Sequence, residues 1–138
     1  MATISNIGEL LKKMQPELRD GKFYFCSVEP SQLMSLASLL DCVLCIQREK
    51  EGLSVVFSED AKESMETICS KKIIGPFALI TLNVHSDLLA VGFLAKITAA
   101  LAKEGISANA MSAYHHDHLL VPYGLKGDAM GALKALGN

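Results

Sequence analysis

The sequence lacks tryptophan, a predominant charge sign and any long hydrophobic run. Its 13 basic and 15 acidic residues nearly balance, and the basic residues form no stripe with aromatic side chains. This pattern gives the chain no electrostatic preference for nucleic acid or an anionic membrane. No stretch approaches the roughly 20 apolar residues of a membrane-spanning helix. The N-terminal residues also lack the basic and apolar regions of a signal peptide, so we expect a cytoplasmic protein.

The residue patterns that support catalysis are missing as well. The sequence shows no nucleophile with an orienting base, no carboxylate pair at a fixed spacing and no glycine loop that cradles phosphate. Cys42 and Cys45 form a CxxC, but the surrounding "DCVLCIQ" predicts a strand, where residues three apart face opposite sides. We therefore predict reduced, buried thiols, no cofactor and no enzymatic activity.

The 138 residues suit one compact domain or two very small ones, and half of them are apolar. An apolar stripe at helical spacing predicts an N-terminal helix whose regular part ends at Pro16; the stripe comprises Ile7, Leu10, Leu11, Met14 and Leu18. After this helix, the order strand, helix, strand, strand, helix occurs twice, and Gly75-Pro76 separates the two copies. We therefore predict one repeat over residues 1–75 and a second over residues 76–138.

This element order predicts an α+β fold in which helices cover one face of a largely antiparallel sheet. In the second half, "FALITLNV" (77–84) alternates, with Ala78, Ile80, Leu82 and Val84 on one face. A helix follows from Gly92, and Gly105 closes it in the position favoured by glycine after a helix.

The segment "VGFLAKITAALAKEGISANAMSAYHHDHLLVPYG" resembles the helix–strand–strand part of ACT domains, the regulatory amino-acid-binding modules of aspartate kinase and phosphoglycerate dehydrogenase. Gly92 and Gly105 have the spacing of that family, and Val91-Gly92 stands where many members have Pro-Gly. The whole chain is similar to small bacterial proteins made of two ACT-like repeats, and more distantly to the cytosolic arginine sensors of eukaryotes. The resemblance implies two ferredoxin-like βαββαβ repeats with a regulatory or sensor role.

The sequence departs from the family pattern in two places. Neither repeat shows an obvious fourth strand, so we expect a neighbouring repeat, a partner subunit or an N-terminal segment to complete each sheet. We also predict a homodimer, because an incomplete sheet leaves an edge that must be paired. The second departure is Ser107, which stands where the family often has asparagine.

The resemblance to ACT domains implies that an amino acid binds where the first strand of a repeat runs into its first helix. The matching loop of the second repeat spans residues 85–92, and the amides of a helix N-terminus can bind a carboxylate. Asp87 could hold an ammonium group, and Gly92 would let a ligand approach the backbone. Alternatively, Ser86 or Asp87 merely caps the helix. The candidate ligand-binding residues are His85, Ser86, Asp87, Val91, Gly92, Ser107 and Asn109.

Three of the four histidines lie in "AYHHDHLLVP" (113–122). If His116-Asp117 form a two-residue turn, His115 and His118 oppose each other closely enough to share a metal ion. Two ligands do not make a zinc site, however, and Asp117 would then point away. The leading hypothesis is a non-catalytic regulator that binds an amino acid. The alternatives are an interaction module without a small ligand and a metal-binding protein that uses His115 and His118.

Overall fold

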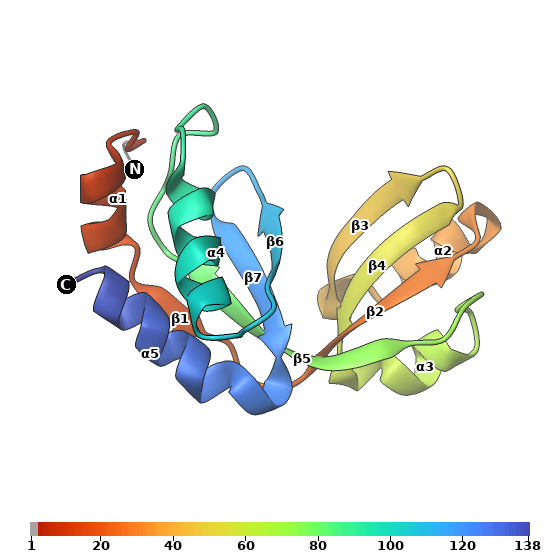
Figure 1. Cartoon of the computed structure of the whole chain (residues 1–138). Helices are drawn as coiled ribbons and strands as arrows, with labels where there is room; N and C mark the ends of the chain where they lie inside the picture. Colours follow the sequence, from red (N-terminus) through yellow and green to blue (C-terminus); the bar gives the residue numbers. More distant parts are fainter. Residues whose placement is uncertain (1–2) are drawn as a thin grey trace. The chain divides into compact units, whose positions relative to one another are not determined.

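The computed structural model describes residues 3–138, which form two compact units (Figure 1). The central unit comprises Gly21–Phe77. The terminal unit combines the residues up to Asp20 with Ala78–Asn138. The long strand β5 (Ile74–Leu82) contributes its first residues to the central unit and its remaining residues to the terminal unit.

The central unit is an antiparallel sheet with the order β3-β4-β2-β5. Ile74 and Phe77 of β5 pair with β2, so the start of β5 is the fourth strand that the sequence did not reveal. The helices of this unit pack on the sheet face that carries the stacked rings of Tyr24 and Phe57, 5.7 Å apart. Its other elements are β2 (Phe23–Val28), α2 (Leu33–Ala37), β3 (Val43–Glu49), β4 (Gly52–Ser58) and α3 (Lys62–Glu66).

The terminal unit repeats this arrangement with the order β1-β5-β7-β6. Its fourth strand is β1, whose Leu18 pairs with Ile80 of β5. Both units are therefore complete ferredoxin-like sheets. Its elements are α1 (Ile7–Lys13), β1 (Pro16–Leu18), the end of β5, α4 (Phe93–Lys103), β6 (Asn109–Ser112), β7 (Asp117–Pro122) and α5 (Lys126–Leu136).

These strands correct two expectations. The sheets do not lack a fourth strand, so the reason given above for a homodimer is wrong. The N-terminal helix ends at Lys13, and Leu18 lies in β1 because Pro16 has no amide hydrogen to continue a helix. Residues 3–20, placed above in the first repeat, pack with residues 78–138.

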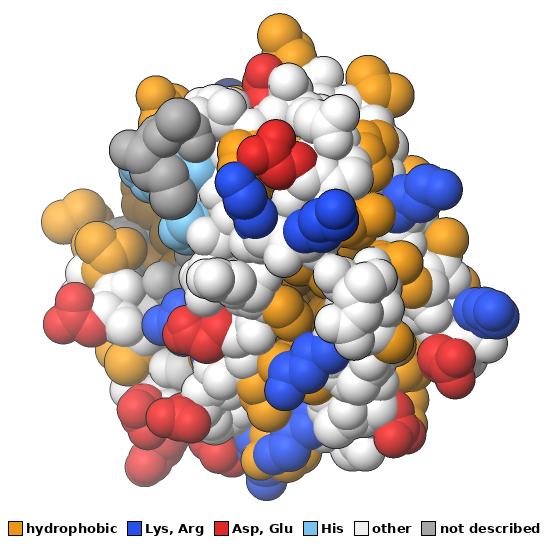
Figure 2. All heavy atoms as spheres, turned by 90° about the vertical axis from the view of Figure 1, so that its left-hand side faces the viewer, with side chains coloured by type: hydrophobic (Ala, Val, Ile, Leu, Met, Phe, Trp, Pro, Cys, Tyr) orange, Lys and Arg blue, Asp and Glu red, His pale blue; other side chains and the backbone are white. Residues whose placement is uncertain are grey.

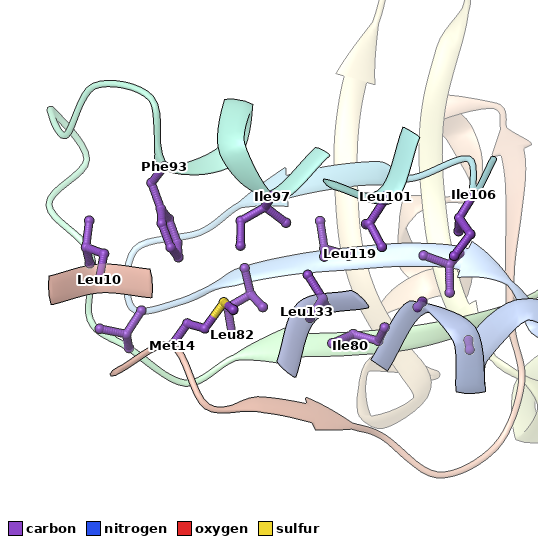
Figure 3. Packing of buried hydrophobic residues seen from close by; sticks show 14 residues of the cluster. Leu10, Met14, Ile80, Leu82, Phe93, Ile97, Leu101, Ile106, Leu119 and Leu133 are labelled. Carbon is purple, nitrogen blue, oxygen red and sulfur yellow. The ribbon is translucent and has the colours of Figure 1, made fainter. Parts of the chain in front are cut away.

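The core of the terminal unit lies between its sheet and its helices (Figure 3). The predicted alternation is confirmed on β5, since Ala78, Ile80 and Leu82 are fully buried in this core. Helix α4 contributes a buried stripe that Figure 3 shows facing the sheet, namely Phe93, Ile97 and Leu101. Gly105 follows α4 with φ of 72°, as its predicted position requires. Within residues 3–138, no helix is long and apolar enough to cross a membrane.

Candidate functional site

The loop between β5 and α4 is held in place by the N-terminal segment. The Ile4 amide donates to the carbonyl of His85 at 3.0 Å, and the Asp87 amide donates to the carbonyl of Ile4 at 2.9 Å. These two bonds make a short parallel bridge between Ile4 and Ser86. The backbone of the loop is therefore anchored before it reaches the helix.

Asp87 does not cap α4. Its Oδ1 accepts a hydrogen bond from the amide of Leu89 at 2.9 Å, and its carbonyl accepts one from the amide of Ala90 at 2.9 Å. This is an Asx turn, in which the side chain stabilises the loop rather than the helix. The interpretation of Ser86 or Asp87 as the helix cap is wrong, because the residue at the cap position is Gly92.

Helix α4 begins without a side-chain cap. Gly92 adopts φ of 91°, in the left-handed region, and its carbonyl accepts the first helical bond from the amide of Lys96 at 3.0 Å. The amides of Phe93, Leu94 and Ala95 come before this first bond, and the first turn of a helix offers them no carbonyl partner within the helix. They leave hydrogen-bond donors and a partial positive charge at the helix start, which together favour an anion.

A cavity of about 190 Å³ lies at this helix start. Its lining includes the first turn of α4 and three of the predicted site residues, Ser86, Asp87 and Gly92. The volume is several times the ~30 Å³ that one water occupies in the liquid. The cavity can therefore hold a small organic molecule next to the free amides.

Asp117 lines the same cavity and was missed as a site residue by the sequence reasoning. Asp117 is 5% exposed, and its Oδ2 accepts a hydrogen bond from the Ser86 hydroxyl at 3.0 Å. A buried carboxylate is costly unless it is paired, and it can accept about four hydrogen bonds. Asp117 therefore has the capacity to bind a cationic group in the cavity.

The position of Asp117 follows from the hairpin register. Ser112 pairs with Asp117, so the connection is a four-residue loop over residues 113–116 instead of the expected two-residue turn. Asp117 is the first residue of β7. Leu119 and Val121 follow it on the same face of the strand and are buried in the core. The alternation of strand residues was the signal that could have placed Asp117 on this face.

The remaining predicted site residues lie apart from the cavity lining. Val91 is 83% exposed, and the exposed Ser107 and Asn109 do not line the cavity either. His85 lies in the loop, with its ring 5.8 Å from the ring of His115. The lining residues that were not predicted come from three places. Leu88 and Ala90 lie in the loop, others form the start of α4, and Ser112 and Asp117 are at the facing ends of the β6–β7 hairpin.

The histidines are grouped but do not form the predicted pair. His115 lies in the hairpin loop, 6.4 Å from the ring of His116, whereas His118 lies in β7 opposite Met111. The predicted opposition of His115 and His118 is therefore wrong. Figure 2 shows histidine side chains together in one area of the surface. Among residues 3–138, no group of three or more His, Cys, Asp or Glu side chains is placed to hold a metal ion.

His118 has a separate local role. Its Nδ1 lies 3.0 Å from the Thr81 hydroxyl on the neighbouring strand β5. Burial lowers the pKa of His118, and electrostatic interactions with His116 and Arg19 lower it further, against the opposing effect of Asp117. His118 therefore favours its neutral form in the folded protein.

The chain is therefore an α+β protein with two ferredoxin-like units in tandem. The terminal unit has a cavity at the loop between β5 and α4. Comparison with protein families identifies the kind of unit: ACT-domain models match residues 2–68 and residues 76–135. The chain belongs to the ACT-domain family and carries two ACT domains. This membership supports a regulatory role in ligand binding.

Solved structures agree with this assignment. A protein of unknown function from Vibrio cholerae, described as a possible transport protein, is 35% identical with a TM-score of 0.76, and the match covers 95% of both chains. The regulatory subunit of aspartate kinase from Thermus thermophilus is 13% identical with a TM-score of 0.68, covering 89% of this chain and 97% of that one. At 13% identity, the similarity to the aspartate kinase subunit is evidence for a shared fold and not for a shared function. No curated protein matches the sequence significantly.

Proposed function

We propose that the protein is a non-catalytic regulator that binds an amino acid in the cavity of the terminal unit. One observation carries this proposal: the uncapped start of α4 and the buried carboxylate of Asp117 line the same cavity. A positive helix end and a negative side chain are the complements of a zwitterion. Membership of the ACT family supports the regulatory role.

The amino-acid carboxylate binds the amides at the start of α4. These donors need no rearrangement, because the loop is already fixed by its bonds to Ile4. The left-handed conformation of Gly92 turns the chain into the helix and leaves no side chain over its first turn. A carboxylate at this position gains from both the hydrogen bonds and the helix dipole.

The ammonium group binds Asp117 rather than Asp87. The Oδ1 of Asp87 is already used by the amide of Leu89, and Asp87 is part of the loop surface. Asp117 is buried, so its interaction with a cation is less screened by water. The hydroxyl of Ser86 orients this carboxylate through its hydrogen bond and lines the cavity itself.

A thermal-shift screen against the twenty amino acids tests the proposal. A ligand at about 100 times its dissociation constant adds roughly 2.7 kcal/mol to stability, which is several degrees for a domain of this size. We expect at least one amino acid to raise the melting temperature. The same ligand should have a smaller effect on Ser86→Ala. A screen in which no amino acid shifts the wild-type protein contradicts the proposal.

A second candidate function is an interaction module that binds no small ligand. It is favoured by the apolar side chains exposed around the cavity loop, Leu88, Leu89 and Val91, with Tyr114 on the adjacent hairpin. Exposed apolar groups of this kind often mark a protein contact. If this function is correct, a bound partner raises the melting temperature and amino acids do not.

We also propose a cytoplasmic homodimer. The end strands β3 and β6 support dimerisation, because each has a neighbour on one side alone in the described sheets. Two-fold pairing is the commonest closed assembly of soluble proteins. Sedimentation at tens of micromolar tests it: a single species of the 14.9 kDa chain mass would contradict the dimer.

A further inference from the structure

The central unit contains a second hollow, separate from the proposed amino-acid site. Its volume is about 370 Å³, and it lies between α3, β2 and the segment that leads into β5. Three of its lining side chains are lysines, and the others that carry polar groups are Tyr24, Glu66 and Cys69. The proposed regulation by an amino acid leaves this hollow unexplained.

Backbone contacts anchor the segment that leads to Lys71 and Lys72. Lys71 and Lys72 come two and three residues after Cys69, and Cys69 forms an antiparallel bridge with Val28 of β2. The next residue, Ser70, donates both its amide and its hydroxyl to the carbonyl of Ser27, at 2.9 and 3.1 Å. The segment is therefore fixed against the sheet immediately before the two lysines. The third, Lys62, begins α3.

The positive charges of the hollow are not neutralised. Within residues 3–138, none of Lys62, Lys71 and Lys72 forms an ion pair. The ammonium group of Lys62 lies 4.9 Å above the ring of Tyr24, whose hydroxyl donates to Glu59 at 3.0 Å. Glu66 is the one acidic side chain of the lining, so the lining carries a net charge of two positive units.

We propose that this hollow binds a phosphate group, either inorganic phosphate or the terminal phosphate of a small monoester. A phosphate monoester carries a charge of about −1.5 to −2 near neutral pH, which matches the unpaired charge of the lining. Lysine binds phosphate as a point charge, so the three lysines that line the hollow can contact its oxygens without a fixed geometry. Lys71 and Lys72 are exposed, so we expect the affinity to be weak and to fall with salt.

Cys69 supports a site for an anion rather than a reactive thiol. Burial raises the pKa of Cys69 and outweighs the opposing effect of a hydrogen bond with Cys26, and the negative charge of Glu66 raises the pKa further. The thiol is therefore protonated near neutral pH and adds no negative charge to the hollow. A neutral thiol can also act as a weak hydrogen-bond donor.

The test is a titration of isotope-labelled protein with inorganic phosphate at constant ionic strength, followed through amide chemical shifts. We expect saturable shifts for the amides of residues 69–75 and for Lys62. The double variant Lys71→Gln/Lys72→Gln should weaken binding by roughly tenfold or more, because it removes two charged partners. The matched control is Lys50→Gln, an exposed lysine in the β3–β4 turn of the same unit that does not line the hollow.

Three results would overturn the proposal. Shifts that do not saturate, or an equal loss of affinity in Lys50→Gln, would show a diffuse attraction between the protein and any anion. Equal binding of succinate at the same ionic strength would show that the hollow does not select phosphate. Because these residues lie in the central unit, failure here leaves the proposed amino-acid site untouched.

Discussion

Gly92→Ala tests whether the start of α4 depends on a backbone conformation that glycine alone adopts easily. The left-handed region costs other residues about 1–2 kcal/mol, while alanine gains about 0.4–1 kcal/mol by restricting the unfolded chain. A methyl group at Gly92 would also lie 3.0 Å from Cδ1 of Ile7. Moving that side chain off its rotamer costs a further ~0.5–1.5 kcal/mol. We expect Gly92→Ala to destabilise the protein by about 0.5–3 kcal/mol.

Two other glycines separate these contributions. Gly105 has φ of 72° with no atom within 4 Å of an added Cβ, so Gly105→Ala reports the backbone strain less the unfolded-chain gain, without a steric contact, roughly 0–1.6 kcal/mol. Gly131 lies in the middle of α5 with ordinary φ and open space, so Gly131→Ala should stabilise the protein by about 0.5–1 kcal/mol.

The assay is urea unfolding followed by circular dichroism. The contact with Ile7 is isolated in an Ile7→Val background, which removes Cδ1. In that background the cost of Gly92→Ala should fall, whereas the cost of Gly105→Ala should stay the same. The reasoning is refuted if Gly92→Ala is as stable as the wild type. If the cost of Gly92→Ala is the same in the Ile7→Val background as in the wild type, the predicted contact with Ile7 is refuted and the backbone argument is not.

Three further outcomes are expected. Ser86→Ala should weaken amino-acid binding by roughly 0.5–1.5 kcal/mol in calorimetry, or more if its partner is charged; unchanged affinity would exclude Ser86 from the site. Ile97→Ala should lower the free energy of unfolding by about 2–5 kcal/mol, because Ile97 is fully buried, and a loss below about 1 kcal/mol would contradict its core position. Because the folded pKa of His118 is lowered, stability should fall as pH drops below the unfolded value of about 6.5. His118→Gln should flatten that fall, and an unaltered pH profile would contradict it.

The strongly periodic parts of the fold could be predicted from the sequence. The alternation from Ala78 to Leu82 and the helix between Gly92 and Gly105 each combine a repeated apolar pattern with a glycine at a fixed place. Strand β1 could not be predicted, because it has three residues and its Leu18 continued the spacing of the preceding helix. Its role depends on pairing with β5, more than sixty residues later, which local pattern does not reveal.

The candidate site was predictable only in its loop. Ser86, Asp87 and Gly92 line the cavity, since their loop leads directly into the helix start, and their contact with a ligand stays a prediction. Asp117 was missed because the hairpin was assigned a two-residue turn, which placed this residue in the turn rather than in β7. The pairing register of a hairpin is set by the length of its loop as well as by the alternation of its strands. The wrong loop length therefore removed the buried carboxylate of Asp117 from the predicted site.

The central claim is tested most directly by calorimetry with the amino acid that gives the largest thermal shift, on three proteins. The wild type should bind, and Asp117→Asn should bind at least about tenfold more weakly, because it loses a charged partner. Asp87→Asn should bind as the wild type does, because asparagine can still accept the bond from the Leu89 amide. Wild-type affinity in Asp117→Asn, or loss of binding in Asp87→Asn alone, would contradict the account.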